Sequence, residues 1–397
     1  MNVLAGKHIA LGVTSSIAVY RACDMVRLLR SAGAEVHVVL TRHATEMISP
    51  KLFASLSGQT VAVDDFGTGA SYKHLDLSKS DLLLVLPATA NFIGKAAGGI
   101  ADDLLSTTYL ATNPKRVMIA PAMNTRMWEH PALQRNLKQL AAMGSQLLMP
   151  ENGNLACGDV GMGRLINLGE AMDAVEYYFT PHDMRGLKVL VTAGPTKEAI
   201  DPVRFISNHA SGRMGIALAK NAWLRGAEVE LISGPTERKA PLGVKVTKVV
   251  TAIDMHAAVL AKIDVADVFI SSAAVSDFRP EAASVTKLKR GKTKTMELKL
   301  ILNPDILADV GNRRNATQTI IGFALESTLD TVEAKRKLKA KRADLIVLNT
   351  TKALASKRNQ VILVGEDSVE DLPEMFKEQV ADRILDRIVA LRKAGKR

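Results

Sequence analysis

The chain has 397 residues, of which 47% are apolar and 23% charged, so it is long enough for two domains with full cores, and disorder is not expected. The net charge of +11 favours phosphorylated small molecules over nucleic acid as ligands, because aromatic residues make up only 4% and no aromatic stacking platform is evident. Two cysteines, and no apolar run approaching about 20 residues, predict a soluble cytoplasmic protein without disulfides or membrane spans.

The first elements are an apolar strand, a turn and a helix. The strand covers residues 7–12, the turn is centred on Gly12 and carries Ser15 and Ser16, and the helix ends near Gly33, before a second strand at 35–41. Backbone N–H groups at the start of a helix that follows such a strand favour an anionic phosphate. The pattern therefore predicts a nucleotide-like site at this turn.

The rest of the first half predicts an open sheet. Cys23 lies on the apolar face of the first helix and is interpreted as a small core residue. Apolar runs at 81–86 and 116–120 alternate with helical stretches, which is typical of parallel strands covered on both faces. The periodicity lapses around Pro181, so we expect domains at 1–180 and 186–397.

The second half repeats the opening construction with a different turn. A strand at 188–194 leads through a longer loop to Ser211–Gly215, a helix and a strand at 227–234. Further strands are expected at 244–249, 268–272, 319–323 and 344–349, and a last helix has an apolar stripe from Phe376 to Leu391. Residues 279–300 are rich in Lys and Thr around Gly291, which fits a hairpin flap or a mobile lid. A second α/β domain with a second nucleotide-like site follows.

Small and polar residues stand where three strands of the first half end. They can approach a flat ring closely, although helix caps and turns would use the same residue types. Asn124, in the turn Pro121-Ala-Met-Asn124, is either a turn former or a carboxylate ligand. The candidate cofactor-binding residues are Gly12, Ser15, Ser16, Thr41, Pro87, Ala88, Thr89 and Asn91.

Three motifs together resemble the flavin-dependent cysteine decarboxylases: the Pro121–Asn124 turn, Lys73-His-Leu-Asp76 and Ala156-Cys-Gly-Asp159. Alone, His74 also fits an ordinary loop histidine and Cys157 an incidental cysteine. Where many relatives have glycines in the first turn, this chain has Thr14-Ser15-Ser16, and Tyr72-Lys73 precedes the histidine. Neither change removes a hydrogen-bonding group, so binding of FMN is still expected.

The resemblance implies a chemistry for these residues. In this family an oxidised flavin withdraws hydride from the carbon that bears sulfur, and the resulting thioaldehyde accepts the electrons left by carbon dioxide. His74 would assist thiol oxidation as a base or positioner, and Asn124 would hold the carboxylate. Cys157 would protonate the ene-thiolate, so that hydride returns and the product is saturated. The presence of Cys157 favours a coenzyme A pathway enzyme over relatives that modify peptides.

The second half lacks both G-x-G-x-x-G and G-x-x-x-x-G-K-[ST], so neither a standard dinucleotide fold nor a P-loop is supported. Its segments closely resemble phosphopantothenate–cysteine ligases, notably at 201–209, 211–215, 271–277, 287–290 and 303–306. The resemblance implies joining of 4'-phosphopantothenate to L-cysteine through an acyl-cytidylate formed from CTP, with Mg²⁺. Asn208 would handle that intermediate, Lys287 would act on the triphosphate, and Asp277 would touch the metal.

Lys337 and Lys341 are four residues apart, so on a helix they would share a face and could reach one anion, although a solvated basic face is an alternative. By resemblance they belong to the nucleotide pocket. The implied CTP-binding residues are Ser271, Ser272, Ala273, Asp277, Lys287, Pro304, Asp305, Ile306, Leu307, Phe323, Lys337 and Lys341.

The resemblance covers almost the whole chain and implies a bifunctional, homo-oligomeric enzyme of coenzyme A biosynthesis. The implied fold is a flavodoxin/Rossmann-like open parallel sheet followed by a second Rossmann-like α/β ligase domain. Two alternatives remain: a flavin-binding regulatory protein, and a protein whose Lys-rich segments contact nucleic acid. The small-molecule reading predicts no nucleic-acid or membrane partner.

Overall fold

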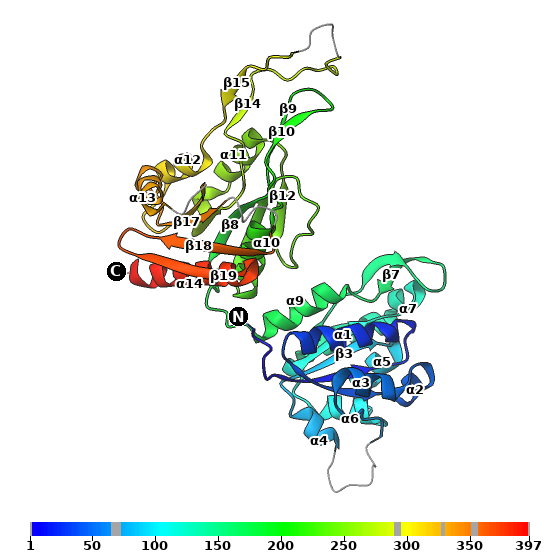
Figure 1. Cartoon of the computed structure of the whole chain (residues 1–397). Coiled ribbons are helices and arrows are strands. Elements are labelled where there is room, and N and C mark those ends of the chain that lie inside the picture. The colour runs from blue at the N-terminus through cyan, green and yellow to red at the C-terminus, as the bar shows by residue number, and fades with distance from the viewer. Residues whose placement is uncertain (1, 65–72, 290–294, 327–329, 351–355, 396–397) are drawn as a thin grey trace. The chain divides into compact units, whose positions relative to one another are not determined.

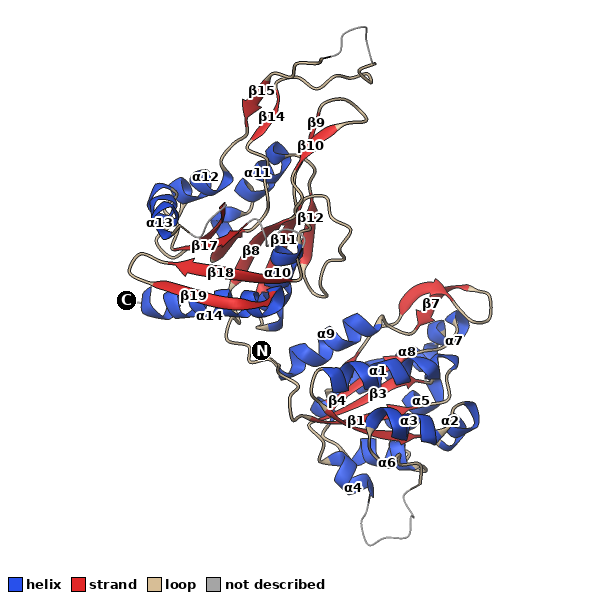
Figure 2. Ribbon diagram, viewed as in Figure 1, coloured by secondary structure: helices blue, strands red, loops and turns tan. Residues whose placement is uncertain are grey.

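The computed structural model describes residues 2–64, 73–289, 295–326, 330–350 and 356–395. The chain divides into two compact units, residues 2–179 and 180–397. Figures 1 and 2 show that each unit has its own sheet and its own covering helices. The predicted boundary at Pro181 adjoins this division.

The first unit contains a five-stranded sheet in the order β2-β1-β3-β4-β5, in which all pairs are parallel. This is the strand order of flavodoxin-like folds, in which ligands bind at the carboxyl ends of the strands, where the order reverses between β1 and β3. The predicted parallel flavoprotein-type domain is therefore confirmed. The strands of the unit are β1 (His8–Val13), β2 (Glu35–Leu40), β3 (Leu82–Ala88), β4 (Val117–Pro121), β5 (Gln146–Leu147), β6 (Glu151–Asn154) and β7 (Val160–Arg164).

Helices cover both faces of this sheet, and β3 is therefore buried along its whole length. On one face α5, α6 and α8 form a core with the strands, and on the other α1 contacts both α3 and α9. The helices are η1 (Ile17–Val19), α1 (Tyr20–Ser31), α2 (Arg42–Met47), α3 (Pro50–Ser57), α4 (Lys73–Ser78), α5 (Ala90–Gly98), α6 (Leu104–Ala111), η2 (Pro114–Arg116), α7 (Thr125–Glu129), α8 (Pro131–Met143) and α9 (Leu168–Phe179).

Two details of the first unit differ from the sequence-based expectation. Cys23 is only half-buried, because α1 directs Ala22, Met25, Val26 and Leu29 into the core. Gly12 lies inside β1 instead of at the centre of the turn, and a Cβ there would lie 2.5 Å from Leu105 Cδ1. Close packing of α6 on the strand, not the turn, explains a glycine at this position.

The second unit contains an eight-stranded sheet in the order β12-β11-β8-β13-β16-β17-β18-β19. Its first six strands are parallel and follow the Rossmann order 3-2-1-4-5-6, as predicted, whereas β18 and β19 are antiparallel. The strands are β8 (Lys188–Ala193), β9 (Lys197–Ala199), β10 (Phe205–Ser207), β11 (Glu228–Ser233), β12 (Lys245–Lys248), β13 (Val268–Ser271), β14 (Phe278–Pro280), β15 (Leu300–Leu302), β16 (Thr319–Glu326), β17 (Leu345–Thr350), β18 (Arg358–Val364) and β19 (Val369–Phe376).

The helices of the second unit also lie on both faces of its sheet. Buried residues of α10 and α14 form one core with the strands, and those of α11, α12 and α13 form the other. The helices are α10 (Arg213–Leu224), α11 (Ala252–Leu260), η3 (Ile263–Val265), α12 (Ile306–Arg313), α13 (Thr331–Ala340) and α14 (Lys377–Gly395). Phe376 ends β19 and α14 begins one residue later, so its predicted place in the last helix is wrong.

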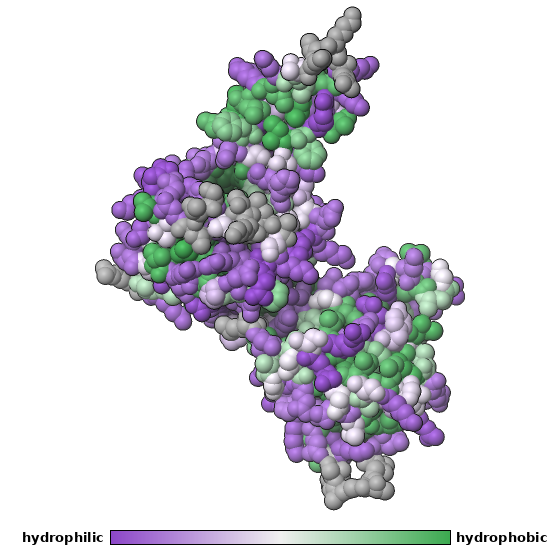
Figure 3. All heavy atoms as spheres, viewed as in Figure 1, coloured by the Kyte–Doolittle hydropathy of each residue, from purple (hydrophilic) through white to green (hydrophobic). Residues whose placement is uncertain are grey.

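The stretch at 279–300 belongs to an arm of the second unit. Phe278 pairs with Leu302 where β14 and β15 run antiparallel, so the base of this stretch is a hairpin. Gly291 and Arg290 lie outside the described residues. Phe278, Leu300 and Leu302 are exposed, and Figure 3 shows an apolar patch over this arm.

Across both units, the described helices include none with the length and apolarity needed to cross a membrane.

Candidate functional site

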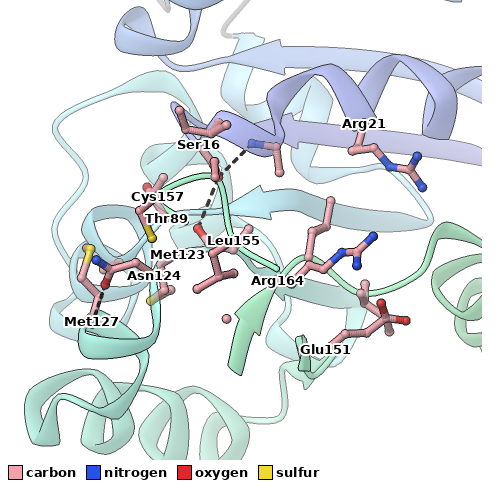
Figure 4. A pocket seen from close by; sticks show the side chains of 18 of the residues that line it. Ser16, Arg21, Thr89, Met123, Asn124, Met127, Glu151, Leu155, Cys157 and Arg164 are labelled. Carbon is pink, nitrogen blue, oxygen red and sulfur yellow. Dashed lines mark hydrogen bonds between the residues drawn. The ribbon is translucent and has the colours of Figure 1, made fainter. Parts of the chain in front are cut away.

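A cavity of about 850 Å³ opens where β1, β3 and β4 end in the first unit. Five predicted residues line it: Ser15, Ser16, Thr89, Asn124 and Cys157. Its volume is within the roughly 300–1,000 Å³ of small-molecule sites. The carboxyl edge of the sheet therefore brings two of the predicted decarboxylase residues, Asn124 and Cys157, to one cavity (Figure 4).

Buried hydroxyl groups tie the three strand ends together. Thr14 is 1% exposed, and its Oγ1 donates to the carbonyl of Pro87 and accepts from the N–H of Thr89, both at 2.9 Å. Ser16 Oγ donates to the carbonyl of Ala122 at 3.3 Å. These bonds fix the first turn against the ends of β3 and β4.

Asn124 is the N-cap of α7. Its Oδ1 accepts from the N–H of Met127 at 2.9 Å, which holds the amide in one orientation (Figure 4). Because the oxygen is used in the cap, the amide nitrogen is left as the donor side. Asn124 is thus both a turn residue and a donor suited to a carboxylate.

Cys157 lies in the tight turn that joins β6 to β7. The Leu155 N–H donates to the carbonyl of Asp159 at 2.8 Å, and the Gly158 N–H donates to the carbonyl of Leu155 at 3.0 Å. The exposed thiol of Cys157 donates to Asp159 Oδ2 at 3.5 Å. An ordered hairpin therefore presents the thiol beside a carboxylate.

Glycines allow this hairpin to pack against the start of α7. Gly163 has φ +126°, and a Cβ there would lie 2.3 Å from the carbonyl oxygen of Met123. The Met123 N–H donates to the Gly163 carbonyl at 3.0 Å. A Cβ on Gly161 would lie 2.3 Å from Thr125 Oγ1. The hairpin that carries Cys157 is thereby fixed beside the turn that carries Asn124.

Other predicted residues of the first unit do not line this cavity. Thr41 caps α2 by accepting from the Ala44 N–H at 3.3 Å, and Asn91 is exposed on α5. Gly12, Pro87 and Ala88 lie within β1 and β3.

His74 also lies outside this cavity. It is half-buried on α4, which lies at the opposite end of the unit from α7 in Figure 1. One copy of the chain thus does not bring His74 to Cys157 and Asn124.

The cavity also contains charged residues that the sequence did not single out. Arg21 comes from α1, and Glu151 and Arg164 come from the two strands of the hairpin; Figure 4 shows them across the cavity from Asn124. Strand ends and helix starts can be located from apolar runs, but an isolated arginine carries no such signal. The two guanidinium groups suit an anionic ligand group.

A second pocket, of about 140 Å³, lies at the carboxyl edge of the second unit's sheet. Predicted residues Ser211, Gly212, Ser272, Ala273 and Phe323 line it. The pocket is also lined by four polar or charged residues that were not assigned to the site: Arg213, Asn349, Asn359 and Lys377.

Two contacts with Thr192 fix the loop after β13 at this pocket. Ser272 Oγ donates to the Thr192 carbonyl at 2.6 Å, and the Ala273 N–H donates to Thr192 Oγ1 at 3.2 Å. Asn208 is exposed and donates from Nδ2 to the carbonyl of Ala274, which also lines the pocket, at 2.9 Å. Asn208 is therefore attached to the pocket wall.

A buried carboxylate anchors the segment that carries Lys287. Asp201 is 3% exposed and accepts two bonds from the Arg204 guanidinium, at 2.6 and 3.0 Å. These bonds hold the pKa of Asp201 well below its usual range. The Leu288 N–H also donates to Asp201, at 3.1 Å. Lys287 is exposed immediately before this anchor.

Lys337 and Lys341 each pair with a carboxylate, and their predicted contact with one anion stays a prediction. Lys337 pairs with Glu326 at 2.6 Å, whereas Lys341 pairs with Asp305. The helix ends at Ala340, and Lys341 is its C-cap, whose backbone N–H donates to the Lys337 carbonyl at 2.9 Å. Each lysine has its own carboxylate partner.

The remaining predicted nucleotide residues lie outside the small pocket. Asp305 caps α12 by accepting from the Ala308 N–H at 2.9 Å. Pro304 precedes this cap, and Ile306 begins the helix. The side chain of Leu307 packs against Gly322 of β16, where a Cβ would lie only 2.6 Å from it. Ser271 is the last residue of β13.

Asp277 is exposed, and its backbone carbonyl accepts from the Asn303 N–H at 2.8 Å. Within the described ranges, the one group of three potential metal ligands is His8, Glu35 and His37, which does not include Asp277. Asp277 thus belongs to no group of three such ligands in the described parts of the chain, and its magnesium contact stays a prediction.

Two family matches divide the chain in the same way as the structure. The flavoprotein family matches residues 2–179, and the family described as DNA/pantothenate metabolism flavoprotein C-terminal domain matches residues 184–391.

Curated relatives match over nearly the full length. Over 98% of this chain and 99% of the relative, the chain is 39% identical to the coenzyme A biosynthesis bifunctional protein CoaBC of Vibrio vulnificus. The identity to the Escherichia coli protein of the same name is 40% over 97% of both chains, and to that of Bacillus subtilis 41% over 98% of both.

Proposed function

The chain belongs to the CoaBC family of bifunctional coenzyme A biosynthesis proteins, and we propose that its first unit is the decarboxylase and its second unit the ligase. The enzyme has phosphopantothenoylcysteine decarboxylase and phosphopantothenate–cysteine ligase activities, and its substrates are small molecules. The observation that carries the division is the cavity of the first unit, which joins Cys157 and Asn124 in a flavoprotein domain.

The first unit is a flavoprotein, and its cavity fits FMN in volume and in donor chemistry. Ser15 and Ser16 offer hydroxyl groups, and Arg21 offers a guanidinium, to the phosphate. Bound FMN supplies the reversible two-electron chemistry that makes the substrate carboxyl group able to leave. Gly12, Pro87 and Ala88 lie within β1 and β3 and support the strand ends at which the cavity opens.

The chain's own side chains orient the substrate and move its protons. Asn124 donates from its amide nitrogen to the carboxylate that will leave, since its oxygen is held by the α7 cap. Cys157 donates its proton to the ene-thiolate from the hairpin turn, and Asp159 holds the thiol in place. His74 assists deprotonation of the substrate thiol as a base or positioner.

We propose that a homo-oligomer completes this site, with His74 supplied by a neighbouring copy. The support is the separation of α4 from the cavity within one copy. Ile17 and Tyr20 line the cavity and are 66% and 61% exposed, which suits burial against another chain. The cytoplasmic location expected from composition stays a prediction.

In the second unit, CTP activates the carboxylate of 4'-phosphopantothenate and L-cysteine then displaces the nucleotide. Ser211, Gly212 and the amino end of α10 bind phosphate, and Asn208 handles the acyl-cytidylate from its position on the Ala274 wall. Lys287 brings a positive charge from the anchored arm segment. Mg²⁺ accompanies the triphosphate, with Asp277 as a candidate contact.

A regulatory flavin-binding protein without catalysis is not favoured. Such a protein would not need a thiol ordered beside a carboxylate and a capped asparagine on the same cavity. The full-length match to bifunctional enzymes also includes the ligase half.

The test compares Cys157→Ser with Cys23→Ser, which alters the half-buried cysteine of α1. Phosphopantetheine formation should fall roughly 100-fold or more in Cys157→Ser, because a general acid contributes about that much, while CTP-dependent pyrophosphate release stays at the wild-type rate. Cys23→Ser should retain both activities. Normal phosphopantetheine formation by Cys157→Ser would refute the proton-donor role.

A further inference from the structure

We infer that Asn359 and Lys377 form, with the amino end of α10, an anion subsite that holds the terminal phosphates of the nucleoside triphosphate. The inference rests on the proposed ligase function and extends it to residues of the C-terminal hairpin, formed by β18 and β19, and of the last helix, α14. Both residues line the second pocket together with Ser211 and Gly212.

Asn359 has a buried donor directed to no protein acceptor. The residue is on β18 and is 3% exposed, and its Nδ2 has no hydrogen-bond partner among the described residues. A buried amide without a partner is unfavourable, and such groups are usually satisfied by a ligand or water. A phosphate oxygen in the pocket would satisfy it.

Lys377 places a buried cation on the same pocket. It is the first residue of α14 and is 6% exposed, and its backbone N–H donates to the Lys357 carbonyl at 3.1 Å. Burial, together with the nearby charges of Arg213 and Arg238, lowers the pKa of Lys377, while Glu378 partly offsets this. Basic residues therefore lie close together at this pocket, and such a cluster suits a multiply charged anion.

Arg213 adds a second unpaired donor to this wall of the pocket. Its Nε is buried and has no hydrogen-bond partner among the described residues. Two buried donors on one small pocket, one from β18 and one from α10, indicate an acceptor-rich ligand.

The helix α10 directs further donors toward the pocket. It has 12 residues, and its N-cap Gly212 has φ +72° and provides no side-chain cap. The N–H groups of its first turn are thus available to an anion, which the helix dipole also favours. An Asn359 amide and a Lys377 ammonium on the same pocket distinguish this helix start from an ordinary one.

The size and charge of the pocket indicate which part of the ligand it holds. Its 140 Å³ is below the roughly 300–1,000 Å³ of pockets for whole ligands, so it suits phosphate groups and not an entire nucleotide. Asn208, which is proposed to handle the acyl-cytidylate, donates to the carbonyl of Ala274 on this pocket, and the phosphate retained in that intermediate is the α-phosphate. The cationic residues would then receive the phosphates that leave as pyrophosphate.

The test is calorimetric titration of the full-length protein with CTP, inorganic pyrophosphate and CMP. Asn359→Ala and Lys377→Gln should each weaken binding of CTP and pyrophosphate at least tenfold and leave CMP binding within twofold of wild type. Lys393→Gln, an exposed lysine of the same helix, is the matched control and should bind all three ligands normally.

Thermal unfolding of each variant without ligand separates a binding defect from a folding defect. If Lys377→Gln does not fold, Asn359→Ala decides, and Asn359→Asp should weaken pyrophosphate binding further by charge repulsion. Wild-type affinity for pyrophosphate and CTP in a folded Asn359→Ala or Lys377→Gln variant overturns the subsite while leaving CTP use intact. If the wild-type protein binds pyrophosphate in a Lys377-dependent way but does not bind CTP, the subsite is supported and CTP as the nucleotide substrate is refuted.

Discussion

Gly163→Ala should disable the decarboxylase by displacing the Cys157 hairpin from the Asn124 turn. The new Cβ would lie 2.3 Å from the Met123 carbonyl oxygen, a backbone atom that cannot rotate away, and φ is +126°. Backbone strain of this kind costs about 1–3 kcal/mol, and the 3.0 Å bond from the Met123 N–H to Gly163 contributes about 1 kcal/mol. Together they disfavour the docked hairpin by about 2–4 kcal/mol, or roughly 30- to 700-fold.

The matched control is Gly153→Ala on the other strand of the hairpin. Its Cβ would lie 3.1 Å from Arg164 Nη1, the end of a flexible side chain that can move aside. Release of carbon dioxide and phosphopantetheine should fall more than tenfold in Gly163→Ala and less than threefold in Gly153→Ala, with pyrophosphate release by the ligase unchanged in both. Decarboxylase kcat/KM within twofold of wild type in Gly163→Ala would show that the glycine contact does not position Cys157.

Two other predictions concern the arm segment and the assembly. Asp201→Asn should raise the KM for CTP severalfold, because it weakens the hydrogen bond that anchors Leu288. The pKa of Asp201 is lowered in the folded state, so in the wild type this anchor is fully present above the unfolded pKa of about 3.9. The anchor is lost only as the pH falls toward the folded pKa. An unchanged KM for CTP in Asp201→Asn would contradict the role of the anchor. A wild-type KM that rises between pH 7 and about 5, together with loss of the anchor, would contradict the predicted pH dependence. Co-expressed His74→Ala and Cys157→Ser chains should regain decarboxylase activity that neither has alone, because mixed oligomers contain sites with both native residues; no regain would place both residues of each site on one chain.

Apolar runs predicted most of the parallel strands of both units, although the two-residue strand β5 was missed. Residues 82–88 are buried along their whole length, so their sequence is apolar at every position. The antiparallel strand β19 was missed because only Leu372 of its eight residues is buried and because it contains Glu370, Asp371 and Pro373, which weaken a strand signal. Strand β18 was missed although its residues 361–364 form a buried apolar run.

The site residues followed a similar division. Ser16, Thr89 and Asn124 could be predicted because parallel strands bring their carboxyl ends to one edge. Asn359 and Lys377 could not, since they reach the second pocket from a hairpin and helix far later in the chain than Ser211. His74 was identified by its motif, but a motif does not state which copy of the chain a residue serves.

The C-terminal hairpin also protects the protein from self-association through its sheet. Without β18 and β19, the largely buried strand β17 would present unpaired backbone groups to other chains at the sheet edge. The actual edge is β19, whose acidic side chains and proline oppose pairing with another strand. Replacement of Glu370, Asp371 and Pro373 by valine should therefore make the ligase unit prone to aggregation, although α14 and its core would remain.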